Sequence, residues 1–155
     1  RMDFAKLLMP EAGRVLTAAS SKKRLLHEIG DLVGGVYQLD AGMIVESLLA
    51  RESLGPTGVG NGVALPHARV EGLDSVVGAF VLLDRPVEFD AVDRQPVDIA
   101  FSLFAPLNAG VEHLKALALV SRTLRDASIR AKLRANPNPT TIYAILAGTQ
   151  KSQAA

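Results

Sequence analysis

The segment from Gly58 to His67 carries the residues best suited to chemistry. It reads GVGNGVALPH, so a loop with three glycines leads through a short extended piece to Pro66 and an imidazole. Glycine-rich backbone N–H groups can form a concavity that binds an anion. A histidine with a pKa near 6.5 is largely neutral and nucleophilic at neutral pH. The pair could accept a phosphoryl group on His67; alternatively, the loop is only a turn and His67 is structural.

Other glycine-loop and metal chemistries do not fit this segment. A P-loop requires Gly-Lys-Ser/Thr after its glycines, and this loop contains no lysine. A dinucleotide-binding fingerprint would need glycine at position 63, where valine stands. His67 has no second histidine and no acidic residue within three positions, unlike a zinc cluster. The chain also has no cysteine, which removes thiolate metal sites and cysteine nucleophiles. We therefore expect no metal at this segment.

A cation near the loop would assist such chemistry, because phosphoryl transfer depends mainly on positioning and charge stabilisation. Arg51 lies six residues before Thr57 and could supply that charge, although it could equally be a solvated helix end. Thr57 and Asn61 could donate hydrogen bonds to phosphoryl oxygens or could only shape the loop. The candidate phosphate-binding loop comprises Thr57, Gly58, Gly60, Asn61 and Gly62.

Helices and strands at regular spacing surround this segment. Apolar periodicity predicts two helices before the loop and three after the last strand, with strands between them. The two long apolar runs lack alternation, which is typical of strands covered on both faces. In residue numbers, we expect strands at 15–17, 63–65, 76–83 and 97–104, and helices at 22–35, 41–52, 111–124 and 128–134, with a last helix opened by Asn138 and Pro139. In the helix at 111–124, a stripe of Leu114, Leu117, Ala118, Ser121 and Leu124 is expected to lie on or near one face.

This order of elements predicts a single α/β domain, with a mixed central β-sheet flanked by helices on both faces. The length of 155 residues fits one domain, and residues 149–155 are expected to form a flexible tail. The net charge of +1 and the 5% aromatic content argue against a nucleic-acid partner. No apolar run approaches the roughly 20 residues that span a bilayer. We expect a cytoplasmic protein without membrane insertion.

Four segments carry a family resemblance, and they occur in this order: SKKRLLHEIGDLV, LLARESLGPTGVGNGVALPHARV, FDAVDRQPVDIAFSLFAP and EHLKALALVSRTLRD. Together they resemble the fructose/mannitol-type enzyme IIA family of the bacterial phosphotransferase system, over nearly the whole chain. The chain is most similar to the nitrogen-regulatory branch, since no enzyme IIB, carrier or membrane domain accompanies it. Pro56 stands where serine is common, and Ala68 stands where glycine is common. The second departure leaves the sugar-specific branch open.

The resemblance implies a role for three residues. A histidine-phosphocarrier protein would phosphorylate His67, on Nε2, and Arg51 would be the family's active-site arginine. His113, in the EHLK segment, would be the second active-site histidine, whereas the helix pattern alone favours an exposed first-turn residue. No cofactor is implied, because the phosphocarrier brings the activated group. The phosphorylation state would regulate target proteins such as ion-transport regulators or sensor kinases. The alternatives are a sugar-specific enzyme IIA that passes phosphate to an enzyme IIB, and a non-catalytic binding module.

Overall fold

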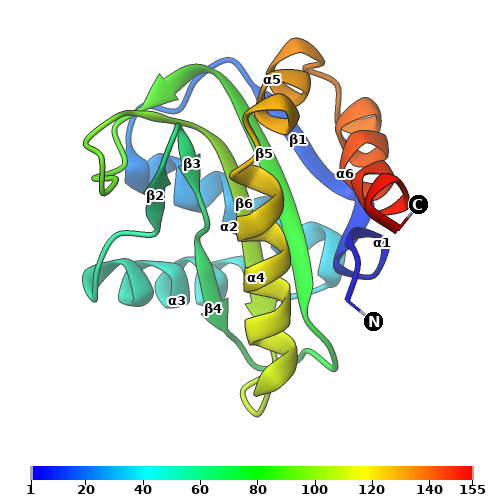
Figure 1. Ribbon diagram of the computed structural model, residues 1–155. Coiled ribbons are helices and arrows are strands. Elements are labelled where there is room, and N and C mark those ends of the chain that lie inside the picture. The colour runs from blue at the N-terminus through cyan, green and yellow to red at the C-terminus, as the bar shows by residue number, and fades with distance from the viewer. Residues whose placement is uncertain (1, 155) are drawn as a thin grey trace.

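A mixed six-stranded sheet forms the centre of the computed structural model, which describes residues 2–154, with side chains as far as Thr149 (Figure 1). The order across the sheet is β1-β5-β6-β3-β2, and β4 also pairs with β6. The pairs β1/β5, β3/β6 and β4/β6 are parallel, whereas β5/β6 and β2/β3 are antiparallel. This confirms the expected mixed sheet. The strands are β1 (Leu8–Leu16), β2 (Gly58–Gly60), β3 (Val63–Ala64), β4 (His67–Arg69), β5 (Val77–Val87) and β6 (Val97–Ala105).

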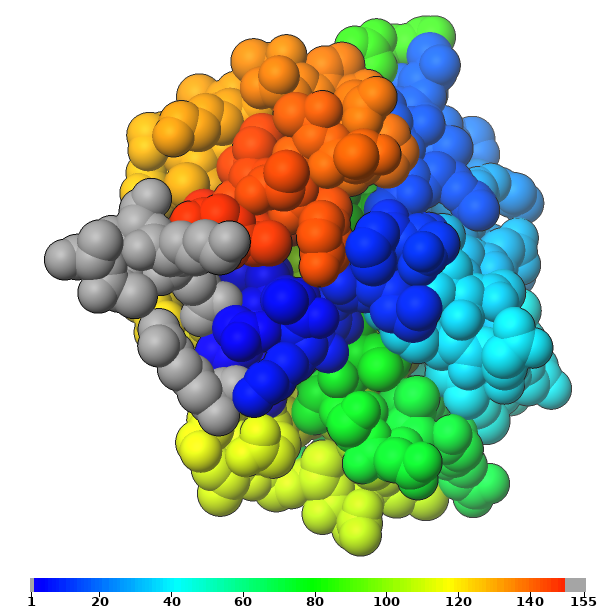
Figure 2. Space-filling view, turned by 90° about the vertical axis from the view of Figure 1, so that its right-hand side faces the viewer, coloured from blue at the N-terminus to red at the C-terminus, as the bar shows by residue number. Residues whose placement is uncertain are grey.

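Helices cover both faces of this sheet, as expected. Figure 1 shows α4 crossing in front of β6, while α2 and α3 lie behind the sheet, where α2 contacts β5 and α3 contacts β4. At the β1 edge of the sheet, on the right in Figure 1, α6 packs against β1. Figure 2 shows the dark-blue N-terminal segment beside the orange-to-red α6. The helices are α1 (Phe4–Leu7), α2 (Lys22–Tyr37), α3 (Ala41–Ser53), α4 (Val111–Leu124), α5 (Ala127–Ala135) and α6 (Pro139–Ala154).

Side-chain caps fix where the two helices before the loop begin. Ser21 accepts a hydrogen bond from the backbone N–H of Arg24 at the start of α2. Asp40 accepts one from the N–H of Met43 at the start of α3. Such caps satisfy N–H groups that have no partner within the helix. The start of α3 is therefore fixed, and its last turn carries Arg51, which contacts the first residue of β4.

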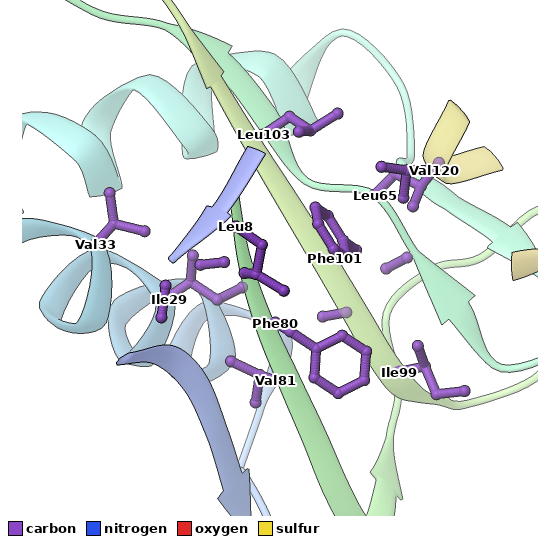
Figure 3. Close-up of a cluster of buried hydrophobic side chains, with 14 of the residues drawn as sticks. Leu8, Ile29, Val33, Leu65, Phe80, Val81, Ile99, Phe101, Leu103 and Val120 are labelled. Carbon is purple, nitrogen blue, oxygen red and sulfur yellow. The ribbon is translucent and has the colours of Figure 1, made fainter. Parts of the chain in front are cut away.

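Buried apolar side chains, mostly aliphatic, fill the centre of the domain around aromatic rings such as those of Phe80 and Phe101 (Figure 3). The ring of Phe101 on β6 meets those of Phe4 and Phe80 edge-on, with centroids 5.6 and 6.4 Å apart. Full burial of one such side chain stabilises the fold by about 1.5–3 kcal/mol. Strand β6 is almost wholly buried and β5 is buried from Gly78 to Leu83, as their apolar runs predict, whereas residues 84–86 of β5 are exposed. Both β3 and β4 pair with β6 in the same sheet, so β6 positions them.

Two expectations about element boundaries were wrong or stay open. The strand expected at 15–17 begins seven residues earlier, at Leu8, because Pro10 and an irregularity before Gly13 hide its pattern. A first short helix, α1, precedes it. The flexible tail expected over 149–155 coincides with the end of α6, where the side chains lie outside the described residues. The tail stays a prediction.

The face of α4 that packs on the sheet differs from the predicted stripe. Leu114 is 67% exposed and Ala118 is exposed, whereas Leu124 is buried as expected. Two apolar stripes therefore run along α4, and the one richer in leucine is only partly buried. The buried residues of α4 are His113, Ala116, Leu119, Val120, Thr123 and Leu124.

Candidate active site

His67 is the first residue of β4 and lies immediately after a break in the sheet. Strand β3 pairs in parallel with β6, the pairing is interrupted at Leu65 and Pro66, and it begins again in β4, where His67 pairs with Leu103. At the break, the His67 ring nitrogen Nδ1 lies 2.8 Å from the backbone oxygen of Leu65. A carbonyl oxygen can only accept a hydrogen bond, so Nδ1 carries the proton and Nε2 keeps its lone pair. The half-buried ring therefore presents Nε2 as its nucleophilic atom.

Arg51 lies against that nitrogen. Its Nε donates to His67 Nε2 over 3.3 Å, and its Nη1 donates to the backbone oxygen of Gly55 over 2.9 Å. The second bond holds the guanidinium at the C-terminal end of α3, where the chain leaves the helix. Because a guanidinium offers several donors in a planar fork, it can release Nε2 and bind an anion there while Nη1 stays on Gly55.

His113 faces His67 from the first turn of α4. The two rings meet edge-on, with centroids 5.6 Å apart and planes at 71°. His113 is only 6% exposed, so it is not the exposed first-turn residue that the helix pattern favours. Its Nε2 is buried and has no hydrogen-bond partner among the described residues. Buried polar atoms are nearly always hydrogen-bonded, so this nitrogen is available to a group that enters beside His67.

Burial keeps both imidazoles neutral. For His67, burial lowers the pKa, the hydrogen bond to Leu65 opposes that change, and the charge of Arg51 lowers the pKa again. For His113, burial lowers the pKa most, followed by the nearby charges of His67 and Arg69. Free histidine titrates near 6.5, so both rings are predominantly uncharged at neutral pH. A neutral His67 with Nε2 unprotonated is the nucleophilic form of the ring.

An open hollow of about 550 Å³ contains this group of side chains. Two arginines and two histidines line it among the described residues, without a carboxylate, so its charge suits an anion. Arg69, which the sequence analysis missed, is one of them and donates to the backbone oxygen of Leu107 over 3.3 Å. Alternate residues of a strand share a face, so its position two residues after His67 could have revealed it. The lining residues are Ser47, Ala50, Arg51, Leu54, His67, Ala68, Arg69, His113, Leu114 and Leu117.

The predicted phosphate-binding loop is not brought to this hollow. Along β6, Val63 pairs with Ile99 and His67 with Leu103. That separation of four residues corresponds to about 13 Å at the usual rise of a strand, and residues 60–62 lie beyond Val63. The backbone N–H of Asn61 donates instead to Asp93, over 3.0 Å. The structure thus groups His67, Arg51 and His113, and leaves Gly60, Asn61 and Gly62 apart from them.

Close packing explains why this loop is rich in glycine. A Cβ atom added to Gly58 would lie 2.7 Å from the Cβ of Ala91. One added to Gly62, whose φ is +78°, would lie 2.5 Å from the guanidinium of Arg134. Thr57 fits the second of its two alternatives, that of shaping the loop, because Glu52 accepts hydrogen bonds from both its N–H and its hydroxyl. These loop residues are engaged within the protein.

Among residues 2–154, no three histidine or acidic side chains gather as a metal site would require. Within the same part of the chain, every helix is too short or too polar to traverse a bilayer.

Known proteins resemble this chain over most of its length. Residues 7–148 match the family described as "Phosphoenolpyruvate-dependent sugar phosphotransferase system, EIIA 2". A nitrogen regulatory protein of Bradyrhizobium diazoefficiens is 43% identical, over 94% of this chain and 95% of that one. A fructose-specific EIIA component of Haloferax volcanii is 33% identical, over 74% of this chain and 73% of that one.

A solved structure extends the match to three dimensions. The nitrogen regulatory protein IIA-Ntr from Neisseria meningitidis superposes with a TM-score of 0.85 at 38% identity, covering 91% of this chain and 97% of that one. The match thus spans the sheet, the helices around it and the sequence that forms the hollow. The chain belongs to the fructose/mannitol-type enzyme IIA family of the phosphotransferase system and, within it, resembles the nitrogen-regulatory proteins.

Proposed function

We propose that this protein is the phosphohistidine-carrying enzyme IIA of a nitrogen-regulatory phosphotransferase system and acts in the cytoplasm. Nε2 of His67 accepts a phosphoryl group from the phosphohistidine of a histidine-phosphocarrier protein. The phosphorylation state then governs binding to regulatory targets, such as ion-transport regulators or sensor kinases. The observation that carries the proposal is the contact of Arg51 Nε with the unprotonated Nε2 of His67, beside the ring of His113, whose own buried Nε2 has no partner among the described residues.

The transfer step needs no cofactor. The lone pair of His67 Nε2 forms the new N–P bond as the donor's P–N bond breaks, and the donor's ring nitrogen takes back its electron pair. The Nδ1 proton stays on the His67 ring, which gains positive charge. The Leu65 carbonyl, 2.8 Å from Nδ1, stabilises that charge. The ring is therefore held in one orientation through the whole step.

Two side chains stabilise the transferred group. Arg51 Nε lies 3.3 Å from Nε2, so a phosphorus bonded to Nε2 brings its oxygens within reach of the guanidinium. Nε2 of His113, when it carries the ring proton, can donate to another of these oxygens. Interactions aimed at the charge of a transferring phosphoryl group are a main source of catalysis in such reactions.

Regulation follows from the surroundings of His67. Leu54 is 83% exposed and Leu114 is 67% exposed, and both line the hollow. A phosphoryl group adds a charge of about −1.5 to −2 at neutral pH. A target that covers these leucines with apolar side chains would bury that charge unpaired, which is costly. Such a target binds the unphosphorylated form and leaves when His67 is phosphorylated.

The test is labelling with phosphoenolpyruvate, the general phosphotransferase protein and the phosphocarrier, followed by intact mass. The wild type should gain one phosphoryl group, which acid removes. His67→Ala should gain none, whereas His27→Ala, which changes a histidine on α2, should label as the wild type does. Undiminished labelling of His67→Ala would remove the proposal. Transfer of the label onward to an enzyme IIB would place the protein in the sugar-specific branch.

A further inference from the structure

A buried carboxylate lies behind the hollow, on the last turn of α3. The side chain of Glu52 is 6% exposed and does not line the hollow. Its Oε1 accepts the hydroxyl of Thr57, and its Oε2 accepts the Thr57 N–H over 3.2 Å and the Lys22 ammonium over 2.8 Å. Lys22 alone could neutralise the charge. The use of both oxygens on Thr57 shows that Glu52 also fixes the loop after α3.

Thr57 connects this carboxylate to the His67 ring. The backbone oxygen of Thr57 accepts the N–H of Leu65 over 2.9 Å, and the oxygen of Leu65 accepts the Nδ1 proton of His67. An unbroken path therefore runs from Glu52 through Thr57 and Leu65 to the ring. The Gly55 oxygen that anchors Arg51 belongs to the same loop, two residues before Thr57.

We infer that Glu52 and Thr57 are positioning residues: by clamping the loop, they hold His67 as the Nδ1–H tautomer and keep Arg51 against Nε2. The inference rests on the proposed function, in which Nε2 of His67 is the phosphoryl acceptor. Hydrogen bonds to an ionised carboxylate are stronger than those between neutral groups. Without them, Thr57 is free to shift, and the Leu65 carbonyl loses its fixed position beneath Nδ1.

The expected effect can be bounded. A net hydrogen bond changes an equilibrium by a factor of about 2 to 12, so the ratio of Nδ1–H to Nε2–H tautomer should fall by that factor. A displaced reacting atom costs up to about 100-fold in rate. Because the loop displacement is partial, we expect about a 10-fold fall in the maximal rate of phosphoryl transfer. The KM for the phosphocarrier should be little changed, since the surface it contacts stays the same.

The tautomer can be read by long-range ¹H–¹⁵N NMR of the imidazole, without any transfer reaction. Glu52→Gln and Thr57→Val should both lower the fraction of His67 protonated on Nδ1. Thr57→Ser keeps the hydroxyl and should restore both the tautomer ratio and the rate. The matched control is Asp40→Ala, which removes the cap at the other end of α3. It should lower the melting temperature and leave the tautomer as in the wild type.

A wild-type tautomer ratio in folded Thr57→Val and Glu52→Gln would overturn the inference, as would a loss in Asp40→Ala of the same size. If Glu52→Gln does not fold, the comparison of Thr57→Val with Thr57→Ser decides, because both keep the ion pair between Glu52 and Lys22. Failure of the wild type to be labelled on His67 would instead defeat the proposed function. The NMR result separates these two failures.

Discussion

Removing the guanidinium of Arg51 should change phosphoryl transfer in two separable ways. The first is a loss of the contact to the transferring group. A hydrogen bond to a charged group contributes about 1.5–3 kcal/mol, so Arg51→Ala should slow transfer roughly 10- to 150-fold where His67 is fully neutral. Arg51→Lys restores a point charge without the planar fork, and its rate should lie between the two.

The second effect concerns the protonation of His67. The charge of Arg51 helps to lower the pKa of this ring, so the pKa rises when that charge is removed. At a given acidic pH, more of His67 is then protonated and cannot attack. The midpoint of the rate profile should move to higher pH in Arg51→Ala, in addition to the lower plateau.

Both effects can be measured as the rate of transfer from the phosphorylated carrier in a quenched-flow experiment. The phosphorylated product is quantified by mass spectrometry at pH values from about 5 to 8. The plateau at high pH reports the contact made during transfer, and the midpoint reports the resting charge. A shifted midpoint with an unchanged plateau would show that Arg51 only tunes His67 and does not bind the phosphoryl group. An unchanged melting temperature is the control for folding.

Three further outcomes are expected. Because burial lowers the pKa values of His67 and His113, the unfolded chain takes up protons at a higher pH than the folded protein does, from about pH 6.5 downwards. In urea titrations, the free energy of unfolding should therefore fall as the pH falls below that value, and it should fall less steeply in a variant with glutamine at both positions. Equal dependence on pH in the two proteins would contradict this. Gly62→Ala, at positive φ in a crowded loop, should lower the free energy of unfolding by about 1–3 kcal/mol, measured in urea, while the folded protein still labels on His67. Leu114→Asp should weaken phosphocarrier binding about tenfold in calorimetry, whereas Val92→Asp, equally exposed at 67%, should not; equal losses would place the interface elsewhere.

Sequence patterns predicted the sheet and its helices because apolar periodicity reports burial directly. The same patterns did not assign the faces of α4: they put Leu114 in a leucine stripe without saying what covers it, and the helix pattern alone favoured an exposed His113, whereas the family resemblance made it an active-site residue. Both points have one origin. A stripe of leucines is apolar whether it faces a core or a partner surface, and a buried histidine carries no hydrophobic signal. Only the packing of α4 on β6 distinguishes the two faces.

The glycine loop shows a second limit of sequence reasoning. Glycine permits backbone approach to a phosphate or to another part of the same chain, and composition does not separate these uses. In this protein, Gly58 approaches Ala91 and Gly62 approaches Arg134. The protonated nitrogen of His67 was likewise beyond the sequence, because it depends on a carbonyl left free where Pro66 interrupts a strand.

The hydrogen bond from Nδ1 of His67 to the Leu65 carbonyl also has a consequence for the reverse reaction. Once Nε2 carries the proposed phosphoryl group, this bond keeps Nδ1 protonated, so the ring can leave phosphorus as a neutral imidazole, which is a good leaving group. In the proposed function, the phosphoryl group therefore stays near its high transfer potential instead of settling into a stable product. The fraction of the protein that is phosphorylated then rises and falls with the phosphorylated fraction of the donor. The protein therefore reports the state of the donor and does not act as a store of phosphoryl groups.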